Sequence, residues 1–283
     1  MFEVQNLIGV VVTYNIKVQE TLTLLTLNDA AAYAGVKLDM IIYDNSNAPQ
    51  AVSADLFSNL NCTYYHDTSN PGVSAAYNFA ANEGRKRNKK FILLLDQDTS
   101  FPADTLLKYM EGLNSNANIN LLCPILHTPK GIFSPSKYYF RRGVIWKNVE
   151  PGKYRLKNRS ALNSGMLINL DAYHSIGGYN PDIQLYFSDF DFLNRFKKRF
   201  QEMVVLDIRC THTLSDIVKG DLFSAVSRFT YYVHGSYNSV LCFKDYSFLF
   251  LTILLRSLKL SLQYRNTQFL SIFFKKYLIE RIF

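Results

Sequence analysis

Four short apolar segments, each ending in polar residues, constrain the fold more than any other feature of this chain. They are LIGVVVTYN (7–15), LDMIIYDNSN (38–47), CTYYHDTSN (62–70) and FILLLDQD (91–98). Apolar residues at helical spacing follow the first segment up to Gly35, and NPGVSAAYNFAANEGRKR (70–87) predicts a turn that becomes a helix. Apolar strands that alternate with helices predict an α/β fold with a mostly parallel central sheet, covered on both faces.

The polar ends of these predicted strands indicate where a ligand binds. In open parallel sheets, ligands bind in the crevice outside the carboxyl ends of the strands. The chain has no GxGxxG after the first strand and no GxxxxGK[ST] anywhere. These absences argue against a dinucleotide-binding oxidoreductase and a P-loop NTPase. Phosphate would have to be bound in another way, and a metal ion held by Asp96 and Asp98 would serve.

The composition fits an ordinary globular protein. Of 283 residues, 48% are hydrophobic, which is enough for a sizeable core. The four cysteines form no CxxC pair, so neither a zinc site nor a disulfide framework is expected. The N-terminus lacks the features of a signal peptide, and no apolar run reaches 18 residues. We therefore expect a protein in a reducing, cytoplasmic compartment.

Residues 221–283 carry eight basic and three acidic residues, a large share of the net charge of +8. The same segment contains the apolar runs FLFLTILL (248–255) and FLSIFF (269–274). Two interpretations stay open: core-packed helices with solvated Lys and Arg, or helices that lie on an anionic membrane surface. No nucleic-acid motif accompanies the charge, so we expect no nucleic-acid partner.

Seven motifs together resemble a known enzyme family. They are GVVVTYN (9–15), YDNSN (43–47), NPGVSAAYN (70–78), LLLDQDTSFP (93–102), NSGMLIN (163–169), IGGYNP (176–181) and SDFDFLNR (188–195). In this order they resemble the inverting, metal-dependent glycosyltransferases of family two, which have the Rossmann-like GT-A fold. The DQD form, with NPGVSAAYN before it, looks most like the bacterial rhamnosyltransferases of O-antigen and capsule synthesis. The resemblance covers roughly residues 7–215.

The resemblance implies a glycosyltransferase domain over residues 1–220, followed by a basic and aromatic helical segment over 221–283. Within the domain, residues 1–100 would bind the nucleotide sugar, and residues 101–220 would form the acceptor half.

Asp96 and Asp98 are the predicted metal site. Mg²⁺ or Mn²⁺ bound by carboxylates and substrate phosphate oxygens neutralises the charge of a leaving diphosphate. The pleat of a strand would point side chains i and i+2 toward one ion. The resemblance implies that Asp98 is a direct ligand, that Asp96 contacts the ribose or the metal, and that His212 is a third ligand. From the residues alone, a turn capped by aspartates is the alternative.

The polar residues at the other strand ends are the predicted nucleotide-sugar site. Their hydroxyl, amide and carboxylate groups can bind a base or ribose, and a helix N-terminus after Gly72 would suit an anion. The alternative for Asn70 is a helix cap. The full predicted set is Thr13, Asn15, Asp44, Asn70, Gly72, Asn78, Asp96 and Gln97.

Asp189 and Asp191 are the predicted catalytic residues. Inversion needs a base opposite the leaving group that takes the proton of the acceptor hydroxyl. Counting back from Arg195, the resemblance implies that Asp189 is this base and that Asp191 positions the base or the acceptor. Aspartates that merely cap a helix are the alternative. Asn163, Ser164 and Gly165 are expected at the diphosphate or the acceptor, because a glycine lets backbone N–H groups approach a ligand closely.

The resemblance thus implies transfer of L-rhamnose from dTDP-rhamnose to a lipid-linked saccharide, at the inner face of the cell membrane. A related transferase that uses galactofuranose or a UDP-hexose is the first alternative. A non-catalytic member that binds a nucleotide or glycan is the second, although a pure binder needs no base such as Asp189.

Overall fold

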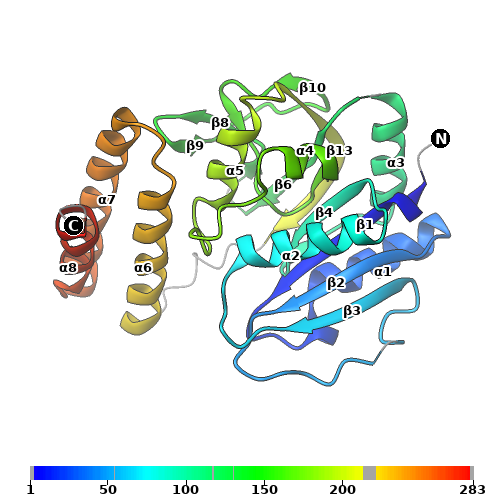
Figure 1. Cartoon of the computed structure of the whole chain (residues 1–283), viewed down its shortest axis with the longest axis horizontal. Coiled ribbons are helices and arrows are strands. Elements are labelled where there is room, and N and C mark those ends of the chain that lie inside the picture. The colour runs from blue at the N-terminus through cyan, green and yellow to red at the C-terminus, as the bar shows by residue number, and fades with distance from the viewer. Residues whose placement is uncertain (1–2, 54, 117, 130, 213–220, 281–283) are drawn as a thin grey trace.

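The computed structural model describes residues 3–53, 55–116, 118–129, 131–212 and 221–280 (Figure 1). Ten of its described strands form one sheet in the order β10-β13-β6-β12-β4-β1-β2-β3, with β5 paired to β13 and β7 to β6, and the other three form a separate small sheet. The strands of this sheet are β1 (Leu7–Thr13), β2 (Leu38–Asp44), β3 (Leu60–His66), β4 (Phe91–Asp96), β5 (Thr99–Ser100), β6 (Leu121–Thr128), β7 (Gly131–Ser134), β10 (Gly152–Arg155), β12 (Met166–Asn169) and β13 (Glu202–His212).

The predicted parallel part of the sheet is confirmed. Strands β3, β2, β1 and β4 are parallel neighbours, and their register aligns Thr13 with Asp44 and Val12 with Asp96. The carboxyl ends of these strands therefore meet at one edge. Strand β12 lies antiparallel between β4 and β6, which the sequence did not predict.

Helices cover both faces of this sheet (Figure 1). Strand β1 is buried along its whole length because alternate residues enter two separate hydrophobic cores. Ile8 and Val10 pack with Tyr77 on one face, and Val11 packs with Leu24 on the other. The helices of this domain are α1 (Leu22–Ala34), α2 (Val73–Lys86), α3 (Thr105–Ser115), α4 (Leu170–Ser175) and α5 (Ser188–Phe196). Helix α1 ends at left-handed Gly35, as predicted.

The C-terminal segment is helical, as expected, and forms a third hydrophobic core. Its helices are α6 (Leu222–Asn238), α7 (Phe243–Tyr264) and α8 (Gln268–Phe274). They lie beside the small sheet of β8 (Ser136–Tyr139), β9 (Arg142–Val144) and β11 (Arg159–Ser160) (Figure 1). Ile183 and Phe187 of the segment before α5 complete this core. The predicted domain boundary at residue 220 lies outside the described residues. Within the described part of the chain, no helix is long and apolar enough to span a membrane.

Candidate active site

Asp44, at the end of β2, is fully buried in a hydrogen-bonded network. Its Oδ1 accepts from the backbone N–H of Ser46 at 2.9 Å, and its Oδ2 accepts from Tyr64 Oη at 2.8 Å and Gln50 Nε2 at 3.0 Å. Burial opposes ionisation, but the hydrogen bonds from Ser46, Tyr64 and Gln50 prevail and lower the pKa of Asp44. Asp44 is thus an ionised acceptor that also orders the loop after β2.

The end of β1 lies between the loop after β2 and the turn after β4. Thr13 is fully buried, and its hydroxyl has no hydrogen-bond partner among the described residues. Asn15 has a left-handed backbone and donates its N–H to Ser46 Oγ at 2.8 Å. Gln97 accepts from the backbone N–H of Tyr14 at 2.8 Å through its Oε1. The three predicted nucleotide residues therefore meet here, but Gln97 also has a local role.

The start of α2 is packed closely against the segment before α5, although Val73 also lines the crevice described below. Gly72 has a φ of 87°, and a Cβ there would overlap the backbone of Gln184. The N–H of Val73 donates to the Gln184 carbonyl at 2.7 Å. Asn70 is only partly buried and also has a left-handed backbone. The geometry explains Gly72 by close packing, which the sequence analysis did not anticipate.

Asn78 joins α2 to the segment that leads to α5. Its Oδ1 accepts from Tyr173 Oη at 2.7 Å and from the Tyr179 N–H at 2.9 Å, and its Nδ2 donates to the Tyr179 carbonyl at 2.8 Å. Because these bonds occupy both ends of the amide, a contact with a nucleotide would have to displace or share one of them.

Asp96, Asp98 and His212 lie together at the end of β4. The strand ends at Asp96, and Asp98 lies in the turn to β5 rather than on a continued strand, because the chain must turn for β5 to pair with β13. His212 Nδ1 is 3.5 Å from Asp98 Oδ1 and 2.8 Å from the hydroxyl of Thr99. Asp96 and Asp98 are near one another, as predicted. The predicted reason, that both lie on the same face of one pleated strand, is wrong, because Asp98 lies in the turn.

The chemistry of this acidic pair suits a cation. Burial raises the pKa of Asp96. Burial also raises the pKa of Asp98 to about 6, an effect that His212 opposes and the Asp96 carboxyl increases. No group of three or more His, Cys, Asp and Glu side chains among the described residues forms a ready metal cage. The Asp98 side chain is 32% exposed, so it can still share a cation with a ligand, as Mg²⁺ sites with one or two carboxylates do.

Asp189, near the start of α5, is buried within the same crevice as Asp96. Its Oδ1 accepts from the N–H of Phe190 at 2.7 Å. Burial raises the pKa of Asp189 to about 7; the Phe190 bond opposes this shift and the Asp96 charge adds to it. Phe187, just before the helix, has a φ of 72°, which is a costly backbone conformation for a bulky residue. This conformation turns the chain into α5, which begins at the next residue. A carboxyl group that titrates near neutral pH is suited to act as a general base.

Asp191 is bound to Arg195 and does not line the crevice. Its Oδ2 accepts from Arg195 Nε at 2.9 Å and from Arg195 Nη2 at 2.8 Å. Arg195 Nη1 in turn donates to the carbonyls of Ile176 and Gly178. Asp191 therefore orients Arg195, and Arg195 joins α5 to the turn before it. This arrangement is compatible with the positioning role implied by the family resemblance.

Of the NSG residues, only Asn163 lines the crevice. It accepts from Tyr179 Oη at 2.7 Å and donates to Ser188 Oγ at 3.2 Å. Ser164 is fully buried, with its hydroxyl 2.7 Å from that of Thr99. Gly165 donates its N–H to the Leu94 carbonyl at 2.7 Å, and a Cβ there would overlap Pro124. Ser164 and Gly165 thus support the site from inside.

The crevice has a volume of about 550 Å³ and extends from the sheet edge to the C-terminal helices. Its acidic end contains Asp96 and Asp189 together with His212. Its far end is basic and apolar, with Arg141, Arg142, Val144, Ile145, Leu185 and Arg256.

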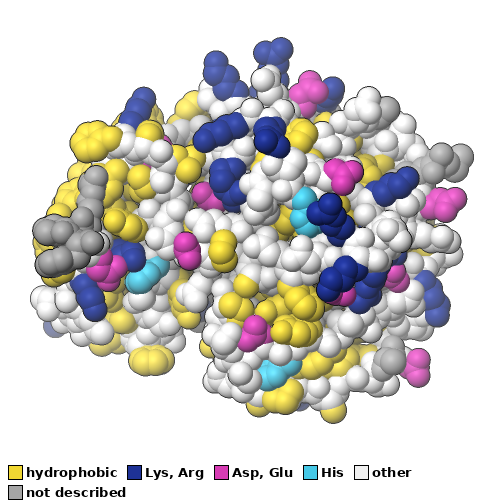
Figure 2. All heavy atoms as spheres, viewed as in Figure 1, with side chains coloured by type: hydrophobic (Ala, Val, Ile, Leu, Met, Phe, Trp, Pro, Cys, Tyr) yellow, Lys and Arg dark blue, Asp and Glu magenta, His cyan; other side chains and the backbone are white. Residues whose placement is uncertain are grey.

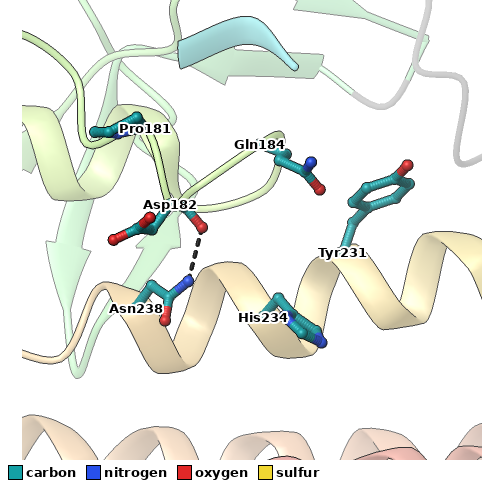
Figure 3. A pocket seen from close by; sticks show the side chains of 6 residues that line it. All are labelled: Pro181, Asp182, Gln184, Tyr231, His234 and Asn238. Carbon is teal, nitrogen blue, oxygen red and sulfur yellow. Dashed lines mark hydrogen bonds between the residues drawn. The ribbon is translucent and has the colours of Figure 1, made fainter. Parts of the chain in front are cut away.

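A second hollow, of about 310 Å³, shares no residue with the crevice. It lies between the loop of Pro181, Asp182 and Gln184 and helix α6 (Figure 3). Asn238 of α6 donates to the Asp182 carbonyl at 2.7 Å across its rim. This hollow marks the place where the C-terminal helices attach to the segment before α5.

Several residues of the site were not predicted from the sequence. Tyr77 donates to Asp96 at 3.2 Å, Thr99 links His212 to Ser164, and Arg142 and Arg256 line the crevice. The position of Tyr77 directly before Asn78 on the predicted helix was an available signal. The arginines gave none, since the structure brings them together from segments more than 100 residues apart.

Residues 10–179 match the family model described as Glycosyl transferase family 2. No curated protein sequence matches the chain. The chain is similar to TarS 1-349 of S. aureus in complex with UDP-GlcNAc, with a TM-score of 0.55 and 16% identity over 96% of this chain and 81% of that one. The mannosyltransferase PcManGT from Pyrobaculum calidifontis, in complex with GDP-Man and Mn²⁺, gives 0.53 and 12%, over 98% and 88%.

GalNAc-T7 with UDP, GalNAc and Mn²⁺ has a TM-score of 0.54 and 11% identity over 73% of this chain. This chain spans only 43% of that protein and 54% of the longer S. aureus TarS chain. At such identities, the likeness concerns the fold alone.

Proposed function

The chain belongs to glycosyl transferase family 2, and from this premise we propose that it transfers a sugar from a nucleotide diphosphate donor to an acceptor hydroxyl, with inversion. The observation that carries the proposal is the crevice in which a buried Asp189, with its pKa near neutrality, shares one cavity with Asp96 and His212 at the carboxyl edge of the sheet. Family membership and the GT-A-like sheet support it.

In this proposal, Asp98 and Asp96 hold a Mn²⁺ or Mg²⁺ ion, with the imidazole of His212 beside them. The ion would neutralise the negative charge on the departing diphosphate. Two structural neighbours were solved with Mn²⁺, which favours the same class of ion here. The raised pKa values of Asp96 and Asp98 also favour a metal ion here, because a cation would stabilise two buried carboxylates that lie close together.

Asp189 acts as the base in the proposed reaction. Its carboxylate takes the proton of the acceptor hydroxyl while the hydroxyl oxygen forms the new bond to the anomeric carbon. The bond from that carbon to the diphosphate oxygen breaks, and the nucleoside diphosphate leaves with the electron pair. Asn163 lies beside Ser188 at the start of α5, where its amide can contact the acceptor.

The nucleotide lies at the ends of β1 and β2 in this account. Asp44 is ionised and accepts from a base N–H or a ribose hydroxyl, and the unpartnered hydroxyl of buried Thr13 offers a further contact. Asn15, Asn70, Asn78 and Gln97 complete the proposed site, with Asn163 at the diphosphate or acceptor side and Ser164 and Gly165 supporting it from inside.

We propose dTDP-L-rhamnose as the donor, because the DQD and NPGVSAAYN motifs resemble those of bacterial rhamnosyltransferases. Galactofuranose and UDP-hexose donors are the alternatives, and the UDP-GlcNAc and GDP-Man complexes of the neighbours show what related folds accommodate. A donor-hydrolysis screen over these sugar nucleotides decides among them. Hydrolysis of dTDP-rhamnose alone supports the proposal, and preference for another donor overturns this part of it.

Thermal shift tests the central proposal. We expect UDP or dTDP to raise the melting temperature only when Mn²⁺ or Mg²⁺ is present, and Asp98→Asn to remove that increase. Asp104→Asn, which changes a partly exposed carboxylate at the N-terminus of α3 outside the crevice, is the control. Equal stabilisation with and without metal would contradict the assignment of Asp98.

The C-terminal helices suit contact with an anionic membrane surface and thus a lipid-linked acceptor. Leu251, Leu255, Leu258 and Leu262 of α7 are 56%, 56%, 41% and 81% exposed, at spacings that place them along one stripe. Exposed Arg256 and Lys259 lie between them in the sequence. Figure 2 shows hydrophobic side chains gathered over this end of the molecule. Such a basic, apolar face is typical of helices that lie in the membrane interface.

Flotation with vesicles tests the membrane proposal. The protein should float with phosphatidylglycerol vesicles and not with phosphatidylcholine vesicles, and replacing Leu255 and Leu262 by Ser should abolish flotation. The same replacement at exposed Leu22 and Leu25 of α1 is the matched control. Sedimentation of all wild-type protein away from anionic vesicles at low salt would overturn the proposal.

A further inference from the structure

The end of the crevice farthest from the sheet carries three arginines, two of which have no ion-pair partner among the described residues. Arg141, Arg142 and Arg256 line it, from the β8–β9 hairpin and from α7. Arg141 is only 6% exposed; it donates to the Ser239 carbonyl and lies 3.7 Å from Asp245. Within the described part of the chain, neither Arg142 nor Arg256 has a carboxylate within ion-pair distance.

One buried polar atom in this region has no partner in the described part of the chain. Arg141 Nε is buried and has no hydrogen-bond partner among the described residues. A buried guanidinium N–H without a partner costs free energy, so a ligand with acceptor oxygens would improve its environment. Burial and the charge of Arg141 also lower the pKa of Lys197, which places a further cation nearby. The region is therefore prepared for an anion.

The hairpin that presents these arginines is strained. Phe140 and Arg141 form its two-residue turn, with φ values of 49° and 62°. Turns of this kind usually contain Asn or Gly, because a side chain disfavours the left-handed conformation. The edge-to-face contact of Phe140 with Phe248, with ring centroids 5.1 Å apart, and the Arg141 contacts hold the turn against α7 and the segment before it. These contacts stabilise the strained turn, and the turn places Arg141 and Arg142 at the crevice.

The basic end belongs to the acceptor side of the crevice. The hairpin packs on α5, with the rings of Tyr138 and Phe190 5.1 Å apart, and Phe190 follows Asp189 directly. Arg256 lies over the ring of Tyr232 at 4.1 Å, and Tyr232 contacts Phe187 at the start of α5. Of the residues proposed for the donor and its metal ion, Asp96 and His212 line the acidic end of this cavity, and Asp44 and Asp98 do not line it.

The walls beside the arginines are apolar and exposed. Phe133, Val144, Ile145 and Leu185 line the crevice and are all among the exposed large hydrophobic residues. A ligand with an anionic head and a hydrocarbon chain would cover both kinds of surface.

We propose that Arg142 and Arg256, with Arg141 behind them, bind the phosphate or diphosphate ester of an amphiphilic acceptor and so hold its hydroxyl at Asp189. This inference rests on the proposed function and adds the recognition of the acceptor. Guanidinium groups suit the task because they form paired, charge-assisted hydrogen bonds to phosphate oxygens.

Isothermal titration of the full chain tests the inference with three probes. Farnesyl diphosphate carries both the charge and the chain, farnesol lacks the charge, and UDP with Mn²⁺ reports the donor site. Replacing both arginines, Arg142→Gln with Arg256→Gln, should weaken farnesyl diphosphate binding by about tenfold or more. The affinities for UDP with Mn²⁺ and for farnesol should stay within about twofold.

The matched control is Lys137→Gln with Lys244→Gln, which removes the same charge from the same hairpin and helix, at exposed positions outside the crevice. This control should bind farnesyl diphosphate as the wild type does. Unchanged binding in the arginine variant, or an equal loss in the control, overturns the inference. A loss of UDP binding in the arginine variant, with farnesyl diphosphate binding intact, would instead assign the arginines to the donor. Failure of the wild type to bind UDP or dTDP with metal counts against the proposed function itself.

Discussion

At the scale of single residues, the pKa of an aspartate side chain differs from one part of this site to another. Asp44 is buried but receives three hydrogen bonds, which lower its pKa. Asp189 is buried with a single bond from a neighbouring N–H, and its pKa rises to about 7. The number of donors around each carboxyl group therefore separates an ionised anchor from a group that can exchange a proton near neutral pH.

Asp189→Asn should reduce kcat by roughly 10²–10⁴-fold and leave the Kd of the nucleotide diphosphate nearly unchanged, because only the proton transfer is lost. In the wild type, kcat/KM should rise with pH through about 7, where Asp189 loses its proton. Steady-state kinetics from pH 5.5 to 8.5 and titration with UDP and Mn²⁺ measure both. Equal losses of kcat and of donor binding would indicate a folding role instead.

The same variant should be more stable than the wild type at high pH. Burial raises the pKa of Asp189 from 3.8 to about 7, so between these values the folded protein holds a proton that the unfolded chain has released. Stability from this group is therefore fully present below about pH 4 and is lost as the pH rises through about 7. The melting temperature of Asp189→Asn should exceed that of the wild type by a few degrees at pH 8. A gap that widened toward pH 5 would contradict this account.

At the scale of elements, contacts across long sequence distances hold the candidate base. Phe187 precedes α5 in a left-handed conformation, and its ring lies 4.9 Å from that of Tyr232 on α6. The backbone of Tyr186 passes so close to Gly235 that a Cβ there would overlap its carbonyl oxygen. Helix α6 therefore supports the segment that leads directly to Asp189.

Gly235→Ala tests this support. The added methyl group should displace the segment before α5 and reduce kcat by about tenfold or more, with little change in donor affinity. Ser227→Ala, at an exposed position of the same helix, is the control. Wild-type kcat in Gly235→Ala would mean that α6 does not position Asp189.

The elements also separate what the sequence could predict from what it could not. The parallel strands and their polar ends follow from apolar runs such as 7–13, so the sheet edge with Thr13, Asp44 and Asp96 was predictable. The β8–β9 hairpin was not, since its burial pattern is weak and its turn contains Phe140 and Arg141 instead of Asn or Gly. Gly72 was misleading for a similar reason, because its neighbour Gln184 is distant in the sequence.

At the scale of the whole molecule, the C-terminal helices complete the crevice as well as extending the fold. Tyr232 and Arg256 come from α6 and α7, whereas Asp96 and Asp189 come from the family domain and the helix after it. The family match ends at residue 179, before Asp189. The proposed base Asp189 and Arg256 of the basic end thus lie outside the matched region, whereas Arg141 and Arg142 lie within it.

The release of nucleoside diphosphate from sugar nucleotides tests the central claim most directly. The wild type should turn over at least one of dTDP-rhamnose, UDP-hexoses and GDP-mannose when Mn²⁺ or Mg²⁺ is present. EDTA or Asp98→Asn should reduce that rate by about 10²-fold or more, because the leaving diphosphate then lacks its counter-charge. Unchanged turnover by Asp98→Asn, or no turnover of any of these donors by the wild type with metal, would contradict the account.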